Sequence, residues 1–316
     1  MKAFRVITPG AYSTVQDLGR FGYQRLGVPL SGALDGYACR VANLLVGNEP
    51  GAAVLELTIV GPQLKFLSET DIALTGARMG MQLNDTPVNT WQRMRVRPGD
   101  RLTIQQVTQG CRAYLALTGG VDVPLVMGSR STYVGGGLGG YEGRPLKAGD
   151  VIESGAATLA EAPLALPAKW IPTYTDPVRL RVVPGPQDDF FDTGLDTLLC
   201  GEYMITAKAD RMGYRLQGPP VAPKPKMPKS IISEPSMPGG IQIPADQQPI
   251  VLFVEQTVGG YTKIATVISS DLPALAQAVP GDTVRFEAVS LAEAHARYRD
   301  FHNTLQVIAN WVNQQR

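Results

Sequence analysis

Three short polar segments of the chain carry side chains that can bind or activate a small substrate. The first, STVQDLGRFGYQ (13–24), holds Gln16, Asp17 and Arg20 among glycines and aromatic residues. A carboxylate beside a guanidinium group binds planar polar groups such as an amide or a ureido group. A solvated loop in which Asp17 and Arg20 form an internal ion pair is the alternative that the sequence leaves open.

The second segment, DRMGYRLQGPP (210–220), contains two arginines and a tyrosine. Arg211 and Arg215 are four residues apart, so strand alternation would place both on one face and Tyr214 on the other. Two arginines on one face suit a carboxylate or a phosphate. An exposed strand face explains the same pattern equally well.

The third segment, VEQTVGGYTK (254–263), supplies Gln256, Tyr261 and Lys263 around a Gly-Gly pair. We expect a hairpin turn there between two apolar strands, because Gly-Gly favours tight hairpin turns. The amide, hydroxyl and ammonium groups beside the turn then make a candidate site. An ordinary surface lysine at position 263 is the alternative.

A glycine-rich stretch, STYVGGGLGGYEGRPLKAGD (131–150), places seven glycines within twenty residues. Its GGGLGG run matches G-x-G-x-x-G, but the dinucleotide motif needs a helix directly afterwards, and glycines and a proline follow here. No G-x-x-x-x-G-K-[ST] motif occurs in the chain. Turns with positive φ or a backbone that faces a ligand explain the glycines instead. Arg144 is the side chain of this stretch that could contact a ligand.

The composition argues against several other classes of protein. Charged residues make up 18% of the 316 residues and the net charge is +1, which argues against a nucleic-acid or membrane surface built on bulk charge. The three cysteines are far apart, and the two histidines lie seven residues apart, so we expect no disulfide framework and no metal site. The chain shows neither a signal peptide nor a long apolar run, which predicts a cytoplasmic protein.

The elements that must position the polar segments are mostly strands. Short, often alternating apolar runs separated by Gly, Pro, Asn and Asp are typical of β structure. One helix is predicted to begin at Asp35 and a short one over 271–278. A third should start at the capping box of Ser290 and Glu293 and run to the end of the chain.

Two strand-rich halves flank a segment rich in Pro and Ala. RMGMQLNDTPV (78–88) and RMGYRLQGPPV (211–221) share six of eleven residues, which indicates two related β domains. The predicted boundaries are 1–165 for the N-terminal domain, 166–177 for the linker and 178–316 for the C-terminal domain with its terminal helix.

Several longer motifs follow one another along the chain: TVQDLGRFGYQRLGVPLSGALD, ANLLVGN, LELTIVGP, GSRSTY, PGPQDDFF, DRMGYRLQGP and QTVGGYTKIATVISSDLPALAQAVPGD. Together, and in this order, they closely resemble the KipA-type family. That family includes the C subunit of bacterial ATP-dependent 5-oxoprolinase, is also called allophanate hydrolase subunit 2, and is similar to half of the carboxyltransferase domain of biotin-dependent urea carboxylase. The resemblance covers Gly10 to about Val289. It implies a mainly β fold of two tandem cyclophilin-like β-barrel domains, with a few short helices and a C-terminal helix.

The resemblance also implies a reaction and partners. The reaction is the ATP-driven opening of 5-oxo-L-proline to L-glutamate, in which phosphorylation of the amide oxygen activates a poorly electrophilic lactam. We expect the chain to act with a KipI-type B subunit and with the oxoprolinase A subunit, and to be inactive alone. ATP is the expected cofactor, bound in complex with these partners, and no metal site is expected in this chain.

Roles for the candidate residues follow from this resemblance and from residue type. Arg211, Arg215 or Lys263 would offset negative charge on a phosphate or on the substrate carboxylate, and Asp17 and Gln16 would orient the lactam amide. Of these, Asp17, Arg211 and Lys263 are the expected catalytic residues. The expected substrate-binding residues are Gln16, Arg20, Arg144, Tyr214, Arg215, Gln256 and Tyr261.

Two other functions remain open at this point. One is the carboxyltransferase half of a biotin-dependent urea carboxylase or allophanate system, in which Asp17 and Arg20 would face the ureido ring of biotin. No biotinyl-lysine segment occurs in the chain, so a partner would have to deliver the biotin. The other function is regulatory binding of a KipI-type protein.

Overall fold

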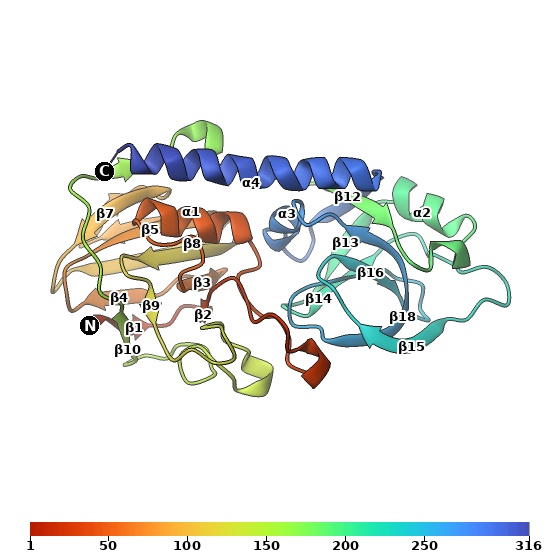
Figure 1. Cartoon of the computed structure of the whole chain (residues 1–316), viewed down its shortest axis with the longest axis horizontal. Helices are drawn as coiled ribbons and strands as arrows, with labels where there is room; N and C mark the ends of the chain where they lie inside the picture. Colours follow the sequence, from red (N-terminus) through yellow and green to blue (C-terminus); the bar gives the residue numbers. More distant parts are fainter. Residues whose placement is uncertain (316) are drawn as a thin grey trace. The chain divides into compact units, whose positions relative to one another are not determined.

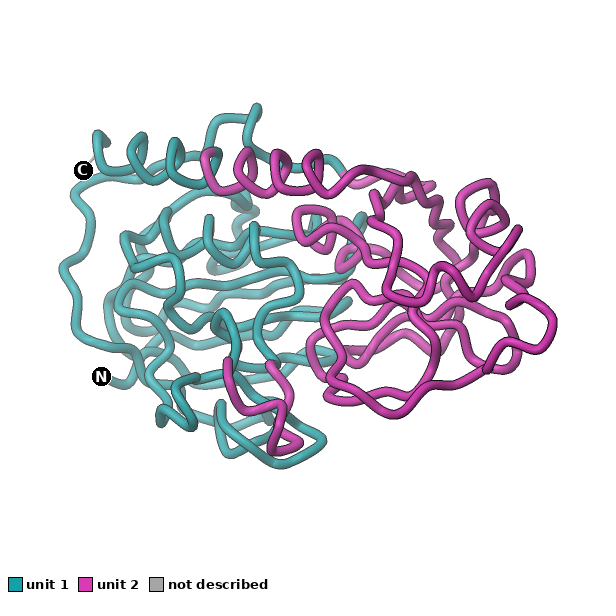
Figure 2. Tube along the Cα trace, turned by 45° about the vertical axis from the view of Figure 1, so that its right-hand side comes forward, with its two compact units in different colours: residues 1–20, 31–173, 304–316 teal, residues 21–30, 174–303 magenta. Residues whose placement is uncertain are grey.

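The computed structural model describes residues 1–315, which form two compact units (Figure 2). Unit 1 contains residues 1–20, residues 31–173 and the C-terminal residues from Thr304 onward. Unit 2 contains residues 21–30 and 174–303. The change of unit after residue 173 falls within the predicted linker. No sequence pattern predicts that residues 21–30 belong to unit 2 or that the residues from Thr304 onward belong to unit 1.

Strands are the predominant regular secondary structure of both units, which confirms the predicted mainly β fold (Figure 1). Unit 1 holds an 11-stranded sheet and unit 2 an 8-stranded sheet. The strands of unit 1 are β1 (Lys2–Thr8), β2 (Tyr12–Gln16), β3 (Val54–Thr58), β4 (Gln63–Phe66), β5 (Thr70–Leu83), β6 (Thr86–Val88), β7 (Gln92–Val96), β8 (Arg101–Leu117), β9 (Val121–Asp122), β10 (Val151–Ser154) and β11 (Leu164–Ala165). The strands of unit 2 are β12 (Val178–Pro184), β13 (Tyr203–Ala209), β14 (Gly213–Gln217), β15 (Ser230–Pro235), β16 (Gly240–Ile243), β17 (Ile250–Leu252), β18 (Val258–Val267) and β19 (Thr283–Ala288).

The sheet of unit 1 is organised by its two longest strands, β5 and β8, which pair antiparallel. β8 also pairs with β3 and with β4, so the sheet branches. Strand alternation sends apolar side chains such as Leu55 and Leu115 into a single core. The helix α1 (Gly36–Leu45) packs against β5 and β8. It begins at the predicted cap, where the Asp35 carboxylate accepts a hydrogen bond from the Ala38 amide at 2.9 Å.

The sheet of unit 2 closes into a barrel. Its strands follow the order β12-β19-β13-β14-β17-β16-β18, and β12 pairs with both β19 and β18. Inward-facing side chains on neighbouring strands form one buried row through Tyr214, Val251 and Ile241. β15 pairs with β18 alone and therefore lies outside the ring.

Three helices follow in the second half of the chain: α2 (Gly194–Cys200), α3 (Leu272–Ala276) and α4 (Leu291–Asn313). The sequence predicts α3 and α4 but not α2. The predicted capping box at the start of α4 is confirmed. The Ser290 amide donates to Glu293 Oε2 at 2.8 Å, and the Glu293 amide donates to Ser290 Oγ at 3.2 Å.

The hairpin turn predicted within residues 254–263 is wrong. β16 pairs with both β17 and β18 and so separates them in the sheet. β18 already begins at Val258, so Gly259 and Gly260 lie inside a strand that pairs with β15. The Gly-Gly pair shows only that the backbone can turn at this point. Which strands become neighbours depends on β16, a strand from another part of the chain.

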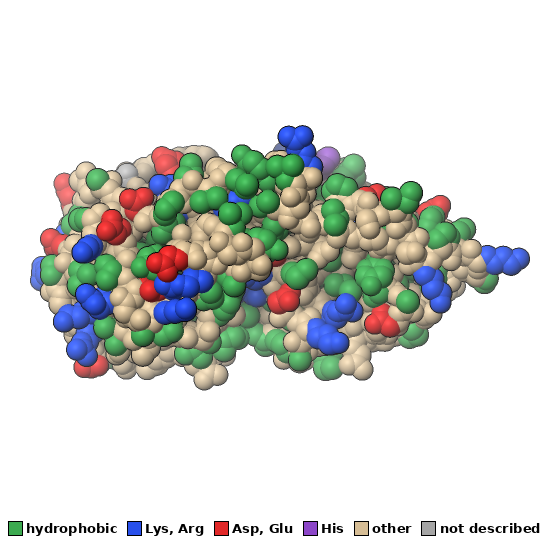
Figure 3. All heavy atoms as spheres, turned by 90° about the horizontal axis from the view of Figure 1, so that it is seen from below, with side chains coloured by type: hydrophobic (Ala, Val, Ile, Leu, Met, Phe, Trp, Pro, Cys, Tyr) green, Lys and Arg blue, Asp and Glu red, His purple; other side chains and the backbone are tan. Residues whose placement is uncertain are grey.

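The surface carries charges of both signs. On the face shown in Figure 3, lysine and arginine side chains are interspersed with acidic, apolar and uncharged polar ones. None of the helices within residues 1–315 is long and apolar enough to cross a membrane. Within the same residues, no group of three or more His, Cys, Asp or Glu side chains could hold a metal ion.

Candidate functional site

The three candidate residues of the first polar segment, Gln16, Asp17 and Arg20, lie in unit 1, where Asp17 anchors a loop. Its carboxylate accepts hydrogen bonds from the Gly19 amide at 2.8 Å, from the Arg130 amide at 2.6 Å and from Ser129 Oγ at 2.7 Å. Ser131 Oγ adds a fourth bond at 2.5 Å. The carboxylate that the sequence assigns to catalysis is therefore surrounded by one donor of its own loop and three donors from residues 129–131.

Arg20 and Gln16 are both buried beside Asp17. Arg20 Nε donates to the Val126 carbonyl at 3.0 Å and Nη2 to the Ser131 carbonyl at 2.9 Å. Burial lowers the pKa of Arg20, and the charge of Asp17 opposes that shift. Gln16 donates to the Thr132 carbonyl at 3.2 Å and accepts from a backbone amide. The structure brings these three residues together, largely through bonds to the backbone.

The glycine-rich stretch packs against the same cluster. Gly139 has φ of +65°, and a Cβ atom there would lie 2.3 Å from the Ser131 carbonyl oxygen and 2.6 Å from Arg20 Nη2. Glycine is thus required by close backbone packing. Arg144 forms ion pairs with Asp150 at 2.8 Å and with Glu142 at 2.5 Å, so its charge is balanced within its own loop.

The two cations that the sequence assigns to catalysis in unit 2 also have carboxylate partners. Arg211 Nε lies 2.5 Å from Glu255 Oε1, and the two side chains are 8% and 10% exposed. Lys263 Nζ contacts Glu234 Oε1, and the lysine side chain is 6% exposed. Arg211 precedes β14 (Gly213–Gln217), so the strand alternation that was expected to place it on one face with Arg215 does not apply to it.

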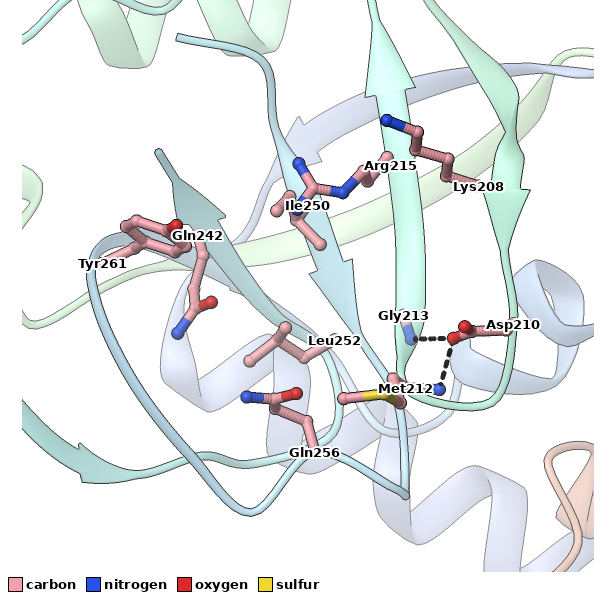
Figure 4. A pocket seen from close by; sticks show the side chains of 10 residues that line it. All are labelled: Lys208, Asp210, Met212, Gly213, Arg215, Gln242, Ile250, Leu252, Gln256 and Tyr261. Atoms are coloured by element: carbon pink, nitrogen blue, oxygen red, sulfur yellow. Dashed lines mark hydrogen bonds between the residues drawn. The ribbon is translucent and has the colours of Figure 1, made fainter. Parts of the chain in front are cut away.

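A pocket of about 480 Å³ lies on the outer face of the unit 2 barrel and gathers three of the predicted binding residues (Figure 4). These are Arg215, Gln256 and Tyr261, whereas Tyr214 faces the barrel interior and packs edge-on against Phe253 with ring centroids 5.0 Å apart. The lining residues are Lys208, Asp210, Met212, Gly213, Arg215, Gln242, Ile250, Leu252, Gln256 and Tyr261.

Strand register explains why these side chains meet. Arg215 on β14 pairs with Ile250 on β17, and Ile250 pairs with Gln242 on β16, so all three point to the outer face. At a spacing of about 4.8 Å between neighbouring strands, the backbones of Arg215 and Gln242 lie about 10 Å apart. Tyr261 from β18 and Gln256 from the segment before it complete the lining.

The electrostatics of the pocket are uneven. Within residues 1–315, neither Lys208 nor Arg215 lies within salt-bridge distance of a carboxylate, whereas Asp210 accepts bonds from the Met212 amide at 2.7 Å and from Gly213. Gln256 Nε2 donates to the Val258 carbonyl at 2.6 Å, which leaves Gln256 Oε1 as an acceptor. One end of the pocket can therefore hold an anion, while amide groups and apolar side chains line the rest.

Three lining residues were not identifiable as site residues from the sequence: Lys208, Asp210 and Gln242. Lys208 and Asp210 resemble ordinary surface residues, and nothing in the sequence links them to the later segment. Gln242 did leave a signal, because it interrupts an apolar strand, GIQI, in which all four residues are buried.

Known proteins resemble this chain over most of its length. The family model for the carboxyltransferase domain, subdomain A and B, matches residues 26–288. The C subunit of 5-oxoprolinase from Escherichia coli K12 is 38% identical over 307 residues, which cover 96% of this chain and 97% of that protein. The urea amidolyase of Lachancea kluyveri is 37% identical over 313 residues, which cover 91% of this chain and 17% of that protein.

Solved structures agree with these matches. The crystal structure of the K. lactis urea amidolyase aligns with a TM-score of 0.91 and 34% identity, covering 98% of this chain and 20% of that chain. This chain thus spans only a fraction of the length of the urea amidolyases. The matches confirm the resemblance to KipA-type proteins. The chain therefore belongs to the carboxyltransferase-domain family that contains the 5-oxoprolinase C subunits and the matching region of urea amidolyases.

Proposed function

We propose that this chain is the C subunit of a cytoplasmic ATP-dependent 5-oxoprolinase and binds the lactam substrate in the unit 2 pocket. The observation that carries the proposal is the pocket itself, in which two unneutralised cations lie beside amide groups. 5-Oxo-L-proline has a carboxylate and a lactam amide, and these groups are complementary to such a lining. The 38% identity to the Escherichia coli C subunit supports the same proposal.

In this proposal the chain binds and orients the substrate. Arg215 and Lys208 hold the carboxylate, and Gln256 accepts a hydrogen bond from the lactam N–H. A lactam is a poor electrophile, so attack by water requires prior phosphorylation of its carbonyl oxygen. The B and A subunits, as partners, supply that activation and the hydrolysis.

Gly139 of the glycine-rich stretch packs against the Ser131 carbonyl and Arg20, which accounts for this glycine without a bound nucleotide. No step on this chain is therefore assigned to ATP, which we place on one of the partners. The proposal also assigns no substrate contact to Asp17, Arg211 or Lys263. Asp17 accepts hydrogen bonds from neighbouring loop residues, and Arg211 and Lys263 are paired with Glu255 and Glu234.

Reconstitution with the B and A subunits tests the proposal. ADP release should depend on 5-oxo-L-proline and on the presence of this chain, and L-proline should not replace the substrate. Arg215→Ala should raise the KM for 5-oxo-L-proline about tenfold or more, because a charged hydrogen-bonding partner of the carboxylate is lost. Equal turnover without the chain would contradict the proposal.

A second candidate function is the carboxyltransferase half of a biotin-dependent urea carboxylase, which the similarity to the K. lactis urea amidolyase favours. In that case the partner would carry biotin, and turnover would depend on urea, bicarbonate and a biotinylated protein. Asp17 and Arg20 are bonded to the loop around them, so a ureido ring would require that loop to rearrange. Urea-dependent ADP release that avidin abolishes would establish this function in place of the first.

A further inference from the structure

We infer that a second pocket on the outer face of unit 2 is a subsite for an α-amino acid and takes the L-glutamate that forms when the lactam ring opens. The inference deepens the proposed function and rests on it. The second pocket has a volume of about 560 Å³ and shares Lys208 and Arg215 with the unit 2 pocket. Asp246 lines the second pocket but not the first. These charges, together with the chemical change that ring opening makes, carry the inference.

Lys208 and Arg215 lie at the boundary between the two pockets because of an irregularity in the pairing of β13 with β14. The register shifts between Ile205 and Ala209, so residues 206–208 lie opposite Arg215 alone. Extra residues in one strand of a pair interrupt the ladder and redirect side chains. Both cationic side chains are exposed, and in Figure 4 their charged ends lie at the same end of the unit 2 pocket. A carboxylate can therefore contact the same two cations from either pocket.

The second pocket also contains a carboxylate without a cationic partner. Asp246 is exposed and forms no ion pair within residues 1–315. Its Oδ1 atom accepts one hydrogen bond, from the Gln248 amide at 3.2 Å. Asp210 in the unit 2 pocket accepts bonds from two amides, at 2.7 Å and 3.3 Å. Of the two carboxylates, Asp246 therefore has more acceptor capacity left for a ligand.

The fold places Asp246 beyond the end of β14, on the far side of the second pocket from the cations. The Gly218 amide donates to Gln248 Oε1 at 2.8 Å, which holds the turn that carries Asp246 beside the end of the strand. Arg215 and Gly218 are three residues apart, or about 10 Å on an extended strand. Charges of opposite sign at such a separation do not pair directly. A ligand that carries both charges can bridge them.

Ring opening produces such a ligand. 5-Oxo-L-proline has one carboxylate and an uncharged lactam nitrogen. When water adds to the lactam carbonyl and the C–N bond breaks, the carbonyl becomes a second carboxylate and the nitrogen becomes an ammonium group. One carboxylate of L-glutamate can then contact Lys208 and Arg215 while the ammonium group binds Asp246. Because both pockets use the same two cations, substrate and product exclude each other.

Calorimetric titration of the full chain with L-glutamate and with glutarate tests the inference. Glutarate is L-glutamate without the amino group, so it cannot pair with Asp246. The wild-type chain should bind L-glutamate about fivefold more tightly than glutarate, because one exposed ion pair is added. Asp246→Asn should abolish this preference, and the amide oxygen of the new side chain can still accept the bond from the Gln248 amide.

Asp189→Asn is the matched control, since Asp189 is an exposed carboxylate of unit 2 that lines neither pocket. This variant should keep the fivefold preference for L-glutamate. Equal binding of the two compounds by the wild-type chain overturns the inference. A preference that persists in Asp246→Asn overturns it as well.

Kinetics of the complex with the B and A subunits separate this inference from the proposed function. L-Glutamate should inhibit competitively with 5-oxo-L-proline, and Asp246→Asn should raise the ratio of its inhibition constant to the KM about fivefold. Inhibition that is not competitive, or an unchanged ratio in an active complex, overturns the inference and leaves the proposed function standing. An inactive wild-type complex overturns the proposed function, and the titration with L-glutamate and glutarate then decides the inference.

Discussion

Replacing Arg211 by methionine should destabilise unit 2 by several kcal/mol, because the substitution leaves Glu255 buried without its partner. The pair is short, with Arg211 Nε 2.5 Å from Glu255 Oε1, and the side chains are only 8% and 10% exposed. The Glu255 amide also donates to the Arg211 carbonyl at 3.0 Å, so the backbones are held together as well. Removing one member of such a pair costs about 3–5 kcal/mol.

The expected shift in melting temperature follows from the size of the unit. At about 2–4 °C per kcal/mol, a loss of about 3 kcal/mol lowers the midpoint by about 6–12 °C. Urea unfolding followed by circular dichroism gives the free energy of unfolding for Arg211→Met, Glu255→Gln and the double variant. The double variant should recover part of the loss, because a neutral amide at position 255 no longer leaves a buried charge unpaired.

Arg215→Met is the matched control, since Arg215 is exposed and has no carboxylate partner within residues 1–315. It should change the free energy of unfolding by less than about 0.5 kcal/mol while weakening substrate binding. An Arg211→Met variant that is as stable as the wild-type chain would refute this account. If that variant were also inactive, the catalytic role expected from the sequence would be favoured.

Three further predictions concern the glycine-rich stretch, the thiols and acid stability. Gly139→Ala should destabilise the chain more than Gly137→Ala, because both positions have positive φ but only the first would place a Cβ against a carbonyl oxygen; urea unfolding measures the difference. Cys200, which is exposed, should react rapidly with a thiol reagent in the native chain, and the two buried cysteines only after denaturation, as absorbance of the released chromophore reports. Burial raises the pKa of Asp150, but the hydrogen bond from Arg144 and other favourable contacts outweigh burial and hold it below the ordinary 3.8. The stability that Asp150 contributes is therefore present above pH 3.8 and lost as the pH falls through the lower folded-state pKa, so Asp150→Asn should flatten the acid limb of the free energy of unfolding.

Local patterns predicted those features that a single segment decides. The Asp35 cap and the Ser290–Glu293 box formed as expected, because each needs only residues three positions apart in a helical turn. Strand alternation correctly separated Tyr214 from Arg215, since successive side chains point to opposite faces. The hairpin expected around Gly259 did not form, because β16 pairs between the two strands that the turn was meant to join.

For the candidate site too, the residues of local polar segments were predicted and those placed by strand register were not. Arg215, Gln256 and Tyr261 were predicted as members of the polar segments 210–220 and 254–263, and the structure gathers them in one pocket. Lys208 and Gln242 were not identifiable, because their roles depend on the register between β13, β14, β17 and β16. Register follows from the pairing of distant strands, and no local pattern specifies it.

The sequence by itself determined the mainly β character, the starts of α1, α3 and α4, and the membership of a family, since these depend on local periodicity, local hydrogen bonds and ordered motifs. Only the tertiary structure decided which polar side chains are free to bind a ligand. Asp17 is bonded to Ser131, 114 residues away, and Arg211 to Glu255, 44 residues away, whereas Arg215 has no such partner within the described residues. The energy of a charge depends on its burial and on its neighbours in space, and chain folding sets both.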